Sequence, residues 1–167
     1  MYKTKNKTVL LALTGLFAAI ICVATSFLKV PAPLGYVHLG DGMIFLAAAF
    51  LGPYGIISAA VGSAIADLLA GYAVYAPVTF VIKGLMALIA WLFIKKFNFK
   101  AVYNIIAFVL CGMVMTGGYF AFECIMYSTS GALAAVTANL IQAAFGIIIG
   151  VVSIRIFKKL IVKINKN

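Results

Sequence analysis

The residues able to do electrostatic or acid–base chemistry are few, and they lie in unusual places. The chain has three acidic residues, Asp41, Asp67 and Glu123, and each lies inside or at the edge of an apolar segment. One lysine, Lys83, also lies within an apolar segment. Ionisable groups in such segments cost about 3 kcal/mol to insert and usually face a cavity or a partner. These four side chains are therefore the first candidates for a binding site.

No catalytic or metal-binding spacing accompanies these residues. The sequence has no Walker A motif, no G-x-S-x-G, no H-E-x-x-H and no cluster of cysteine and histidine. Cys22, Cys111 and Cys124 lie in apolar runs, where we expect small buried side chains without a disulfide. We predict a protein that is not an enzyme and that uses no cofactor or metal.

The composition indicates that lipid surrounds most of the chain. The 167 residues are 66% hydrophobic and 10% charged, and the mean hydropathy is +1.20. A soluble domain of this size needs more polar surface. We predict an all-α integral membrane bundle of six transmembrane helices, forming one domain over residues 1–167 in the cell membrane.

Proline and glycine residues set the bounds of the predicted helices. Pro31 and Pro33 end the first helix and begin a loop, Gly52-Pro53 separates the second from the third, and Pro77 opens the fourth. The predicted helices cover residues 8–28, 41–51, 55–71, 77–95, 101–127 and 132–158.

The net charge of +10 follows the membrane topology and does not indicate nucleic-acid binding. Cations lie before the first helix, between the fourth and fifth, and after the sixth: Lys3, Lys5, Lys7, Lys95, Lys96, Lys100, Arg155, Lys158, Lys159, Lys163 and Lys166. Cytoplasmic segments of membrane proteins are enriched in such residues. We therefore expect both termini in the cytoplasm and the loops at Pro31, Tyr72 and Ser128 outside.

The polar residues of the spans all fall in the outer half of the membrane. At a rise of about 1.5 Å per residue, Asp67 and Glu123 lie roughly 6 Å below their outer helix ends, Lys83 roughly 9 Å and Asn139 roughly 10 Å. This agreement predicts a polar pocket that opens outward. Its candidate residues are Tyr36, His38, Asp41, Asp67, Tyr72, Tyr75, Lys83, Glu123, Tyr127, Asn139 and Gln142.

Each candidate also has an interpretation without a ligand. Asp67 could form a structural ion pair with Lys83, and Asp41 could cap the second helix. Glu123 has no evident partner in its own helix, which makes it the best candidate for a carboxylate that faces the ligand. His38 could equally be a surface or capping residue.

The tyrosines and amides have similar alternatives. The rings near the outer level could stack on a planar ligand or form an interfacial aromatic belt; they are Tyr36, Tyr72, Tyr75, Tyr119 and Tyr127. Asn139 and Gln142 share one face of the sixth helix, and they could contact a ligand or hydrogen-bond between helices.

Small residues recur at a spacing of four. The first helix carries Gly15 and Ala19, and the third carries Gly55, Ala59, Gly62, Ser63 and Ala66. Such spacing permits close approach of backbones. It serves either packing within the protein or docking of a separate membrane protein.

Several sequence segments together resemble the substrate-binding S components of energy-coupling-factor (ECF) transporters. They are residues 35–48 (GYVHLGDGMIFLAA), 51–55 (LGPYG), 66–77 (ADLLAGYAVYAP) and 82–87 (IKGLMA). The likeness spans nearly the whole chain and is greatest to the branch assigned to hydroxymethylpyrimidine, pyridoxine or riboflavin.

The resemblance implies a subunit that binds a vitamin from outside with its first loop and outer helix ends. It implies three partners: a transmembrane coupling subunit and two cytoplasmic ATPases. The family's A-x-x-x-A docking motif matches here as Gly15 and Ala19, with Gly in place of the first Ala. Two other functions remain open: a self-sufficient proton-coupled transporter using Asp67, Lys83 and Glu123, and an intramembrane enzyme using Asp41 and His38.

Overall fold

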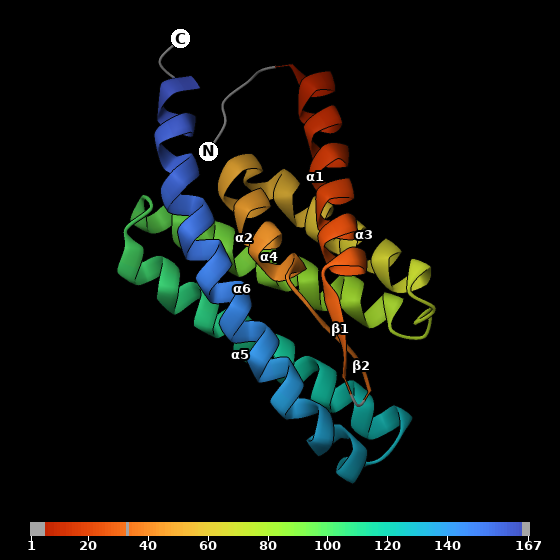
Figure 1. Cartoon of the computed structure of the whole chain (residues 1–167). Coiled ribbons are helices and arrows are strands. Elements are labelled where there is room, and N and C mark those ends of the chain that lie inside the picture. Colours follow the sequence, from red (N-terminus) through yellow and green to blue (C-terminus); the bar gives the residue numbers. More distant parts are fainter. Residues whose placement is uncertain (1–5, 33, 165–167) are drawn as a thin grey trace.

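The computed structural model describes residues 6–32 and 34–164, so Lys3, Lys5, Pro33 and Lys166 lie outside the described residues. Helices α1 to α6 and a two-stranded hairpin make up this part of the chain (Figure 1). The elements are α1 (Lys7–Phe27), β1 (Lys29–Ala32), β2 (Gly35–His38), α2 (Gly40–Leu51), α3 (Pro53–Leu69), α4 (Ala76–Phe97), α5 (Ala101–Met126) and α6 (Thr129–Ile164).

The predicted all-α bundle is confirmed, and the helix bounds agree with the prediction to within about three residues except at the end of α6. Four helices are long and apolar enough to cross a membrane: Lys7–Phe27, Ala76–Phe97, Ala101–Met126 and Thr129–Lys158. The helices Gly40–Leu51 and Pro53–Leu69 are apolar but shorter. Helix α6 continues to Ile164 because no proline or glycine follows Gly150.

The short helix α2 forms the centre of the bundle. It packs against α1, α3, α4 and α6, and most of its side chains are buried. At its end, Gly52 has a φ of 64°, a left-handed conformation that suits glycine, and Pro53 then begins α3. The chain therefore reverses direction within two residues.

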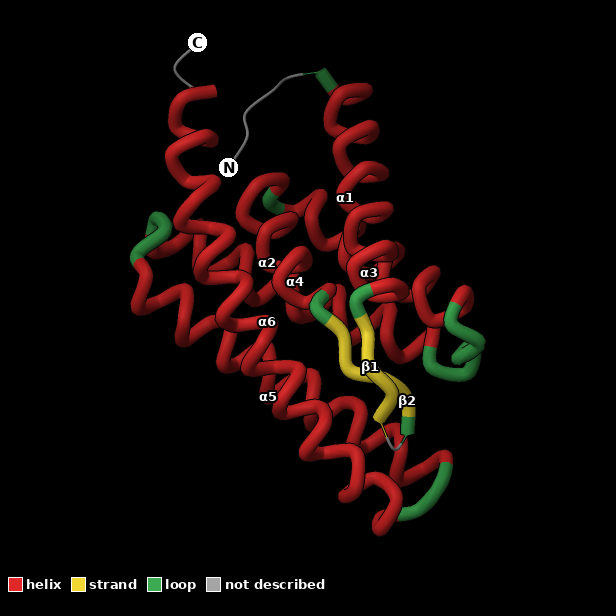
Figure 2. Tube along the Cα trace, in the orientation of Figure 1, coloured by secondary structure: helices red, strands yellow, loops and turns green. Residues whose placement is uncertain are grey.

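A β-hairpin replaces the loop predicted after α1. The antiparallel register pairs Lys29 with His38 and Ala32 with Gly35, and β1 and β2 lie at the end of the bundle opposite the start of α1 and the end of α6 (Figure 2). A hairpin satisfies its backbone groups by pairing its own strands. It therefore forms a compact cover where an irregular loop would leave those groups without partners.

The small residues of α3 serve packing within the protein. A Cβ added at Gly62 would collide with the backbone of Ala18 on α1, and the Ser58 hydroxyl donates a hydrogen bond to the Thr14 carbonyl at 2.8 Å. Glycine and serine thus hold α1 and α3 in close contact. Gly15 differs, because it is exposed and a Cβ added there meets nothing within 4 Å.

Candidate functional site

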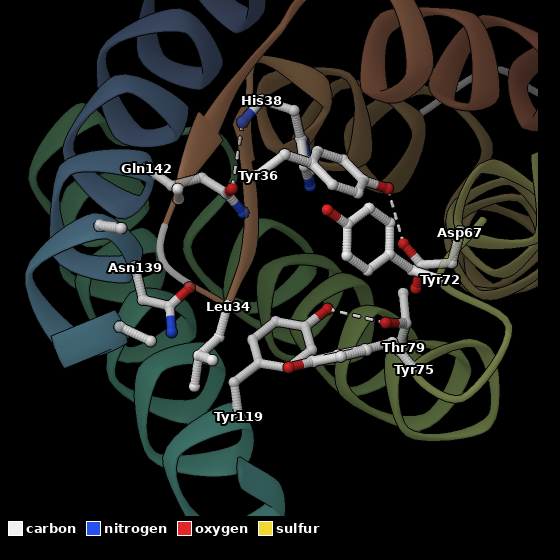
Figure 3. A pocket seen from close by; sticks show the side chains of 13 residues that line it. Leu34, Tyr36, His38, Asp67, Tyr72, Tyr75, Thr79, Tyr119, Asn139 and Gln142 are labelled. Carbon is white, nitrogen blue, oxygen red and sulfur yellow. Dashed lines mark hydrogen bonds between the residues drawn. The ribbon is translucent and has the colours of Figure 1, made fainter. Parts of the chain in front are cut away.

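A cavity lies between the hairpin and the adjoining ends of α3, α4, α5 and α6. It contains about 500 Å³ of empty space, counted out to its open mouth. The lining residues are Ala32, Leu34, Tyr36, His38, Asp67, Tyr72, Tyr75, Thr79, Tyr119, Ala135, Ala138, Asn139 and Gln142 (Figure 3). Seven residues predicted for the pocket are among them: Tyr36, His38, Asp67, Tyr72, Tyr75, Asn139 and Gln142.

Four tyrosines bring their rings together along the cavity. Ring centroids are 5.3 Å apart for Tyr36 and Tyr72, 6.1 Å for Tyr72 and Tyr75, and 6.4 Å for Tyr75 and Tyr119. Offset or tilted aromatic pairs prefer centroid distances of this size. The Tyr119 and Thr79 hydroxyls share a hydrogen bond at 3.0 Å, which fixes one end of the group. The rings provide flat surfaces for a planar ligand.

Asp67 is the carboxylate that lines the cavity. The Tyr36 hydroxyl donates a hydrogen bond to Asp67 Oδ1 at 2.6 Å and so connects the hairpin to α3. The other oxygen, Oδ2, is buried; the Thr79 side chain lies near the carboxyl, but no hydrogen bond of normal geometry joins Oδ2 to the described residues. Buried polar atoms of proteins nearly always have a partner. A free carboxylate oxygen here is therefore a feature to be explained by what the cavity holds.

Helix α6 supplies the wall opposite Asp67, where Asn139 and Gln142 lie in Figure 3. Gln142 accepts a hydrogen bond from the His38 backbone N–H at 3.1 Å. Asn139 Nδ2 is buried without a hydrogen-bond partner among the described residues. The two amides therefore differ: one holds the hairpin, and the other is available to a ligand.

His38 is a neutral hydrogen-bond donor at the inner end of the hairpin. Its Nδ1 accepts a hydrogen bond from the Gly40 backbone N–H at 3.1 Å, so the ring proton is on Nε2. Burial lowers the pKa of His38 to about 4; the nearby Asp41 raises the pKa, and Lys83 and Lys29 lower it. The imidazole therefore stays uncharged at neutral pH.

A buried polar network lies beneath the cavity. Lys83 Nζ on α4 forms an ion pair with Asp41 Oδ1 on α2 at 2.5 Å, and both side chains are at most 1% exposed. Gln142 Nε2 donates to Asp41 Oδ2 at 3.0 Å, so α2, α4 and α6 meet at this carboxylate. Gly146 makes room for it, because a Cβ there would come within 2.9 Å of the Asp41 Cβ.

This network corrects two predictions. The ion pair considered between Asp67 and Lys83 is wrong, because Lys83 pairs with Asp41. The side-chain cap considered for Asp41 is also wrong, because the start of α2 has no side-chain cap and both Asp41 oxygens bind Lys83 and Gln142. Counting residues along the helices places Lys83 level with Asp67. In the structure, α2 begins deep in the bundle, and Asp41 is therefore the carboxylate that reaches Lys83.

Four predicted pocket residues lie outside the lining: Asp41 and Lys83 in the network beneath it, and Glu123 and Tyr127. Glu123 is buried behind Tyr75 and accepts a hydrogen bond from its hydroxyl at 3.4 Å. Tyr127 lies at the end of α5 and is 52% exposed. The side chain that meets the cavity on α5 is Tyr119, one turn before Glu123.

Sequence reasoning missed several lining residues, among them Leu34 and Thr79. A leucine in a loop and a threonine in an apolar helix carry no signal of their own. Thr79 is, however, four residues before Lys83 and so shares its helix face. Ala135 and Ala138 line the cavity next to Asn139, and only a small side chain leaves space there.

Together, the apolar bundle and the partly polar cavity are those of a membrane protein with a site of the size of a small molecule. The chain belongs to the family of S components of ECF-type riboflavin transporters, whose model matches residues 5–159. It is thus a multi-pass plasma-membrane protein, a substrate-binding subunit of a transporter and not an enzyme. The predicted family is confirmed.

Two individual proteins are similar to this chain. A Pyrococcus woesei protein described as an "Uncharacterized protein in gap 3'region" is 38% identical over 134 residues, covering 78% of this chain and 88% of that protein. A solved structure, the S component of a bacterial ECF transporter, matches with a TM-score of 0.70 and 24% identity. The match covers 93% of this chain and 96% of that one, and it concerns the fold.

Proposed function

We propose that this chain captures a vitamin or vitamin precursor from outside the cell for ATP-driven uptake. The favoured ligands are hydroxymethylpyrimidine and pyridoxine, followed by riboflavin. The proposed partners are a transmembrane coupling subunit and two cytoplasmic ATPases, which would supply the ATP hydrolysis for which this sequence has no motif.

The observation that carries this proposal is the cavity beneath the hairpin. It combines tyrosine rings with two buried polar atoms that have no hydrogen-bond partner among the described residues, Asp67 Oδ2 and Asn139 Nδ2. Small-molecule sites are mainly apolar and aromatic, with a few polar groups that fix the orientation of the ligand. A heteroaromatic ring with polar substituents fits this description.

The sequence likeness favours a small pyrimidine or pyridine alcohol, whereas the family description names riboflavin. All three compounds have a planar ring system and carry both donors and acceptors. The cavity chemistry therefore supports the class of ligand, and binding must decide between its members.

A proposed docking surface lies on the side of α1. Ala19 is exposed and lines an apolar groove together with residues of α2 and α6, among them Met43 and Ile149. The groove contains about 920 Å³ of empty space, counted to its open side. A helix of the coupling subunit packed against Gly15 and Ala19 would approach closely, because neither residue has a large side chain.

Isothermal calorimetry on the purified chain in detergent tests the proposed function. The panel contains hydroxymethylpyrimidine, pyridoxine, riboflavin, thiamine and pantothenate. We expect tight binding of one vitamin in the absence of ATP and partners. Asn139→Ala is expected to weaken that binding at least about tenfold, since a buried hydrogen bond is lost, and the control Thr137→Ala, on the exposed face of α6, should leave it unchanged.

Binding of no vitamin by a folded, monodisperse sample would contradict the proposal. Uptake by this chain alone in liposomes, driven by a pH gradient, would then favour a proton-coupled transporter.

A further inference from the structure

We infer that Asp67 makes the cavity selective for the charge of its ligand. The cavity admits a neutral or protonated ring that places a hydrogen-bond donor on Asp67 Oδ2, and it rejects a ring with a carboxylate at that position. This inference rests on the proposed function, since it concerns the ligand of the same cavity.

The contacts of Asp67 suit an ionised carboxylate. The Tyr36 hydroxyl lies 2.6 Å from Oδ1, within the range of about 2.5–2.7 Å that is typical of a hydroxyl bound to a charged oxygen. The side chain is 6% exposed, and Oδ2 has no hydrogen-bond partner among the described residues. A ligand N–H or O–H that met this oxygen would remove the cost of leaving it unpaired.

No cation of the lining compensates this negative charge. The described lining residues include neither lysine nor arginine. Lys83 is held beneath the cavity by its ion pair with Asp41. Lys29 is exposed on β1, with its Nζ 4.7 Å from the centre of the Tyr36 ring. An anionic ligand group would therefore meet Asp67 without a neutralising partner in the cavity wall.

The wall opposite Asp67 offers donors. Asn139 Nδ2 is unpaired and buried, and the neutral His38 ring carries its proton on Nε2 because Nδ1 accepts from Gly40. A complementary ligand therefore presents a donor at one edge of its ring and an acceptor at the other. Aminopyrimidines and hydroxypyridines have both on one planar ring.

The size of the selectivity follows from the cost of placing like charges side by side. That cost is several kcal/mol at a buried interface, so we expect at least about 100-fold weaker binding of an acidic analogue. Replacing Asp67 by asparagine removes the repulsion while keeping the shape of the side chain. In this variant, the loss of affinity for the acidic analogue should be at least about tenfold smaller than in the wild type.

The experiment uses the vitamin that binds best and analogues in which each hydroxyl or amino substituent in turn is a carboxylate, such as pyridoxic acid for pyridoxine. Calorimetry compares the wild type, Asp67→Asn and the control Lys29→Gln. We expect one acidic analogue to be weakened at least about 100-fold in the wild type and to be rescued by Asp67→Asn alone. Thermal unfolding of each variant reports whether it folds.

Acidic analogues that bind the wild type as well as the vitamin would overturn the charge selectivity and leave the proposed function standing. The charge selectivity would also be overturned if binding of the weakened analogue were restored by Lys29→Gln but not by folded Asp67→Asn. If no vitamin binds, the proposed function fails, and this inference fails with it.

Discussion

At the scale of single residues, two groups of polar side chains at and beneath the cavity have different tasks. Lys83, Asp41 and Gln142 bind one another and hold three helices together. Asp67 and Asn139 each keep one polar atom free toward the cavity. The first group is saturated and structural, and the second is the part of the protein that a ligand would complete.

For the Asp41–Lys83 pair, losing one partner should destabilise the fold more than losing both. Lys83→Met leaves a buried carboxylate without its cation, which costs about 3–5 kcal/mol of unfolding free energy. The double variant Asp41→Asn with Lys83→Met removes both charges and should recover most of this loss. Unfolding in detergent, followed by circular dichroism, measures the difference. A double variant no more stable than Lys83→Met would refute this account.

His38 should make stability depend on pH in a defined window. The folded pKa is about 4 against an ordinary value of 6.5, so between these values the unfolded chain binds more protons than the folded chain. Stability therefore falls as the pH drops from 6.5 to 4. In His38→Asn, which can still accept the Gly40 N–H, the fall should be shallower. Melting temperatures at a series of pH values provide the comparison.

At the scale of elements, the hairpin is the element that could not be predicted from the sequence. The helices were predictable, because long apolar runs and the prolines at positions 31, 53 and 77 mark their bounds. The strands have four residues each, and Pro31 lies within β1, which argues against a strand. Their pairing depends on the contact of β2 with α6, which is distant in sequence.

Separation in sequence also explains which parts of the site were predictable. The level of Asp67 and Asn139 followed from counting residues along straight helices. The partner of Lys83 did not, since it depends on where α2 begins relative to α4, and the sequence of α2 alone does not set that position.

The hydrogen bond from the Tyr36 hydroxyl to Asp67 should act as a latch, holding the hairpin against α3 and so slowing ligand release. Tyr36→Phe removes a hydrogen bond to a charged oxygen, worth about 1.5–3 kcal/mol, and should raise the rate of ligand dissociation about tenfold or more. Stopped-flow measurement of ligand release tests this. Tyr103→Phe is the control, because this ring stacks on Phe97 at 3.8 Å near the start of α5. Equal release rates for wild type and Tyr36→Phe would contradict the latch.

At the scale of the whole molecule, the proposed ligand cavity and the proposed docking groove lie on different surfaces. The cavity lies under the hairpin, whereas the groove beside Ala19 opens on the side of the bundle. Leu39 and Met43 of the groove are close in sequence to His38 and Asp41. The two surfaces are therefore separate but share the segment that begins α2.

Ala19→Leu should separate the two activities. The larger side chain fills part of the groove and should reduce co-purification of the coupling subunit at least about tenfold, while vitamin binding stays within about twofold of the wild type. Val109→Leu, on an exposed position of α5, should change neither. Loss of vitamin binding with normal docking would reverse our assignment of the two surfaces.

The length of α6 has a mechanical consequence. This single helix holds Asn139 and Gln142 at the cavity and continues to Ile164, about 33 Å beyond Gln142 at 1.5 Å per residue. A continuous helix behaves as a stiff rod, so a tilt of about 5° at the cavity moves its far end by about 3 Å. A small tilt of α6 at the proposed ligand site would thus become a larger displacement at its far end, on the side of the molecule where α1 begins (Figure 1).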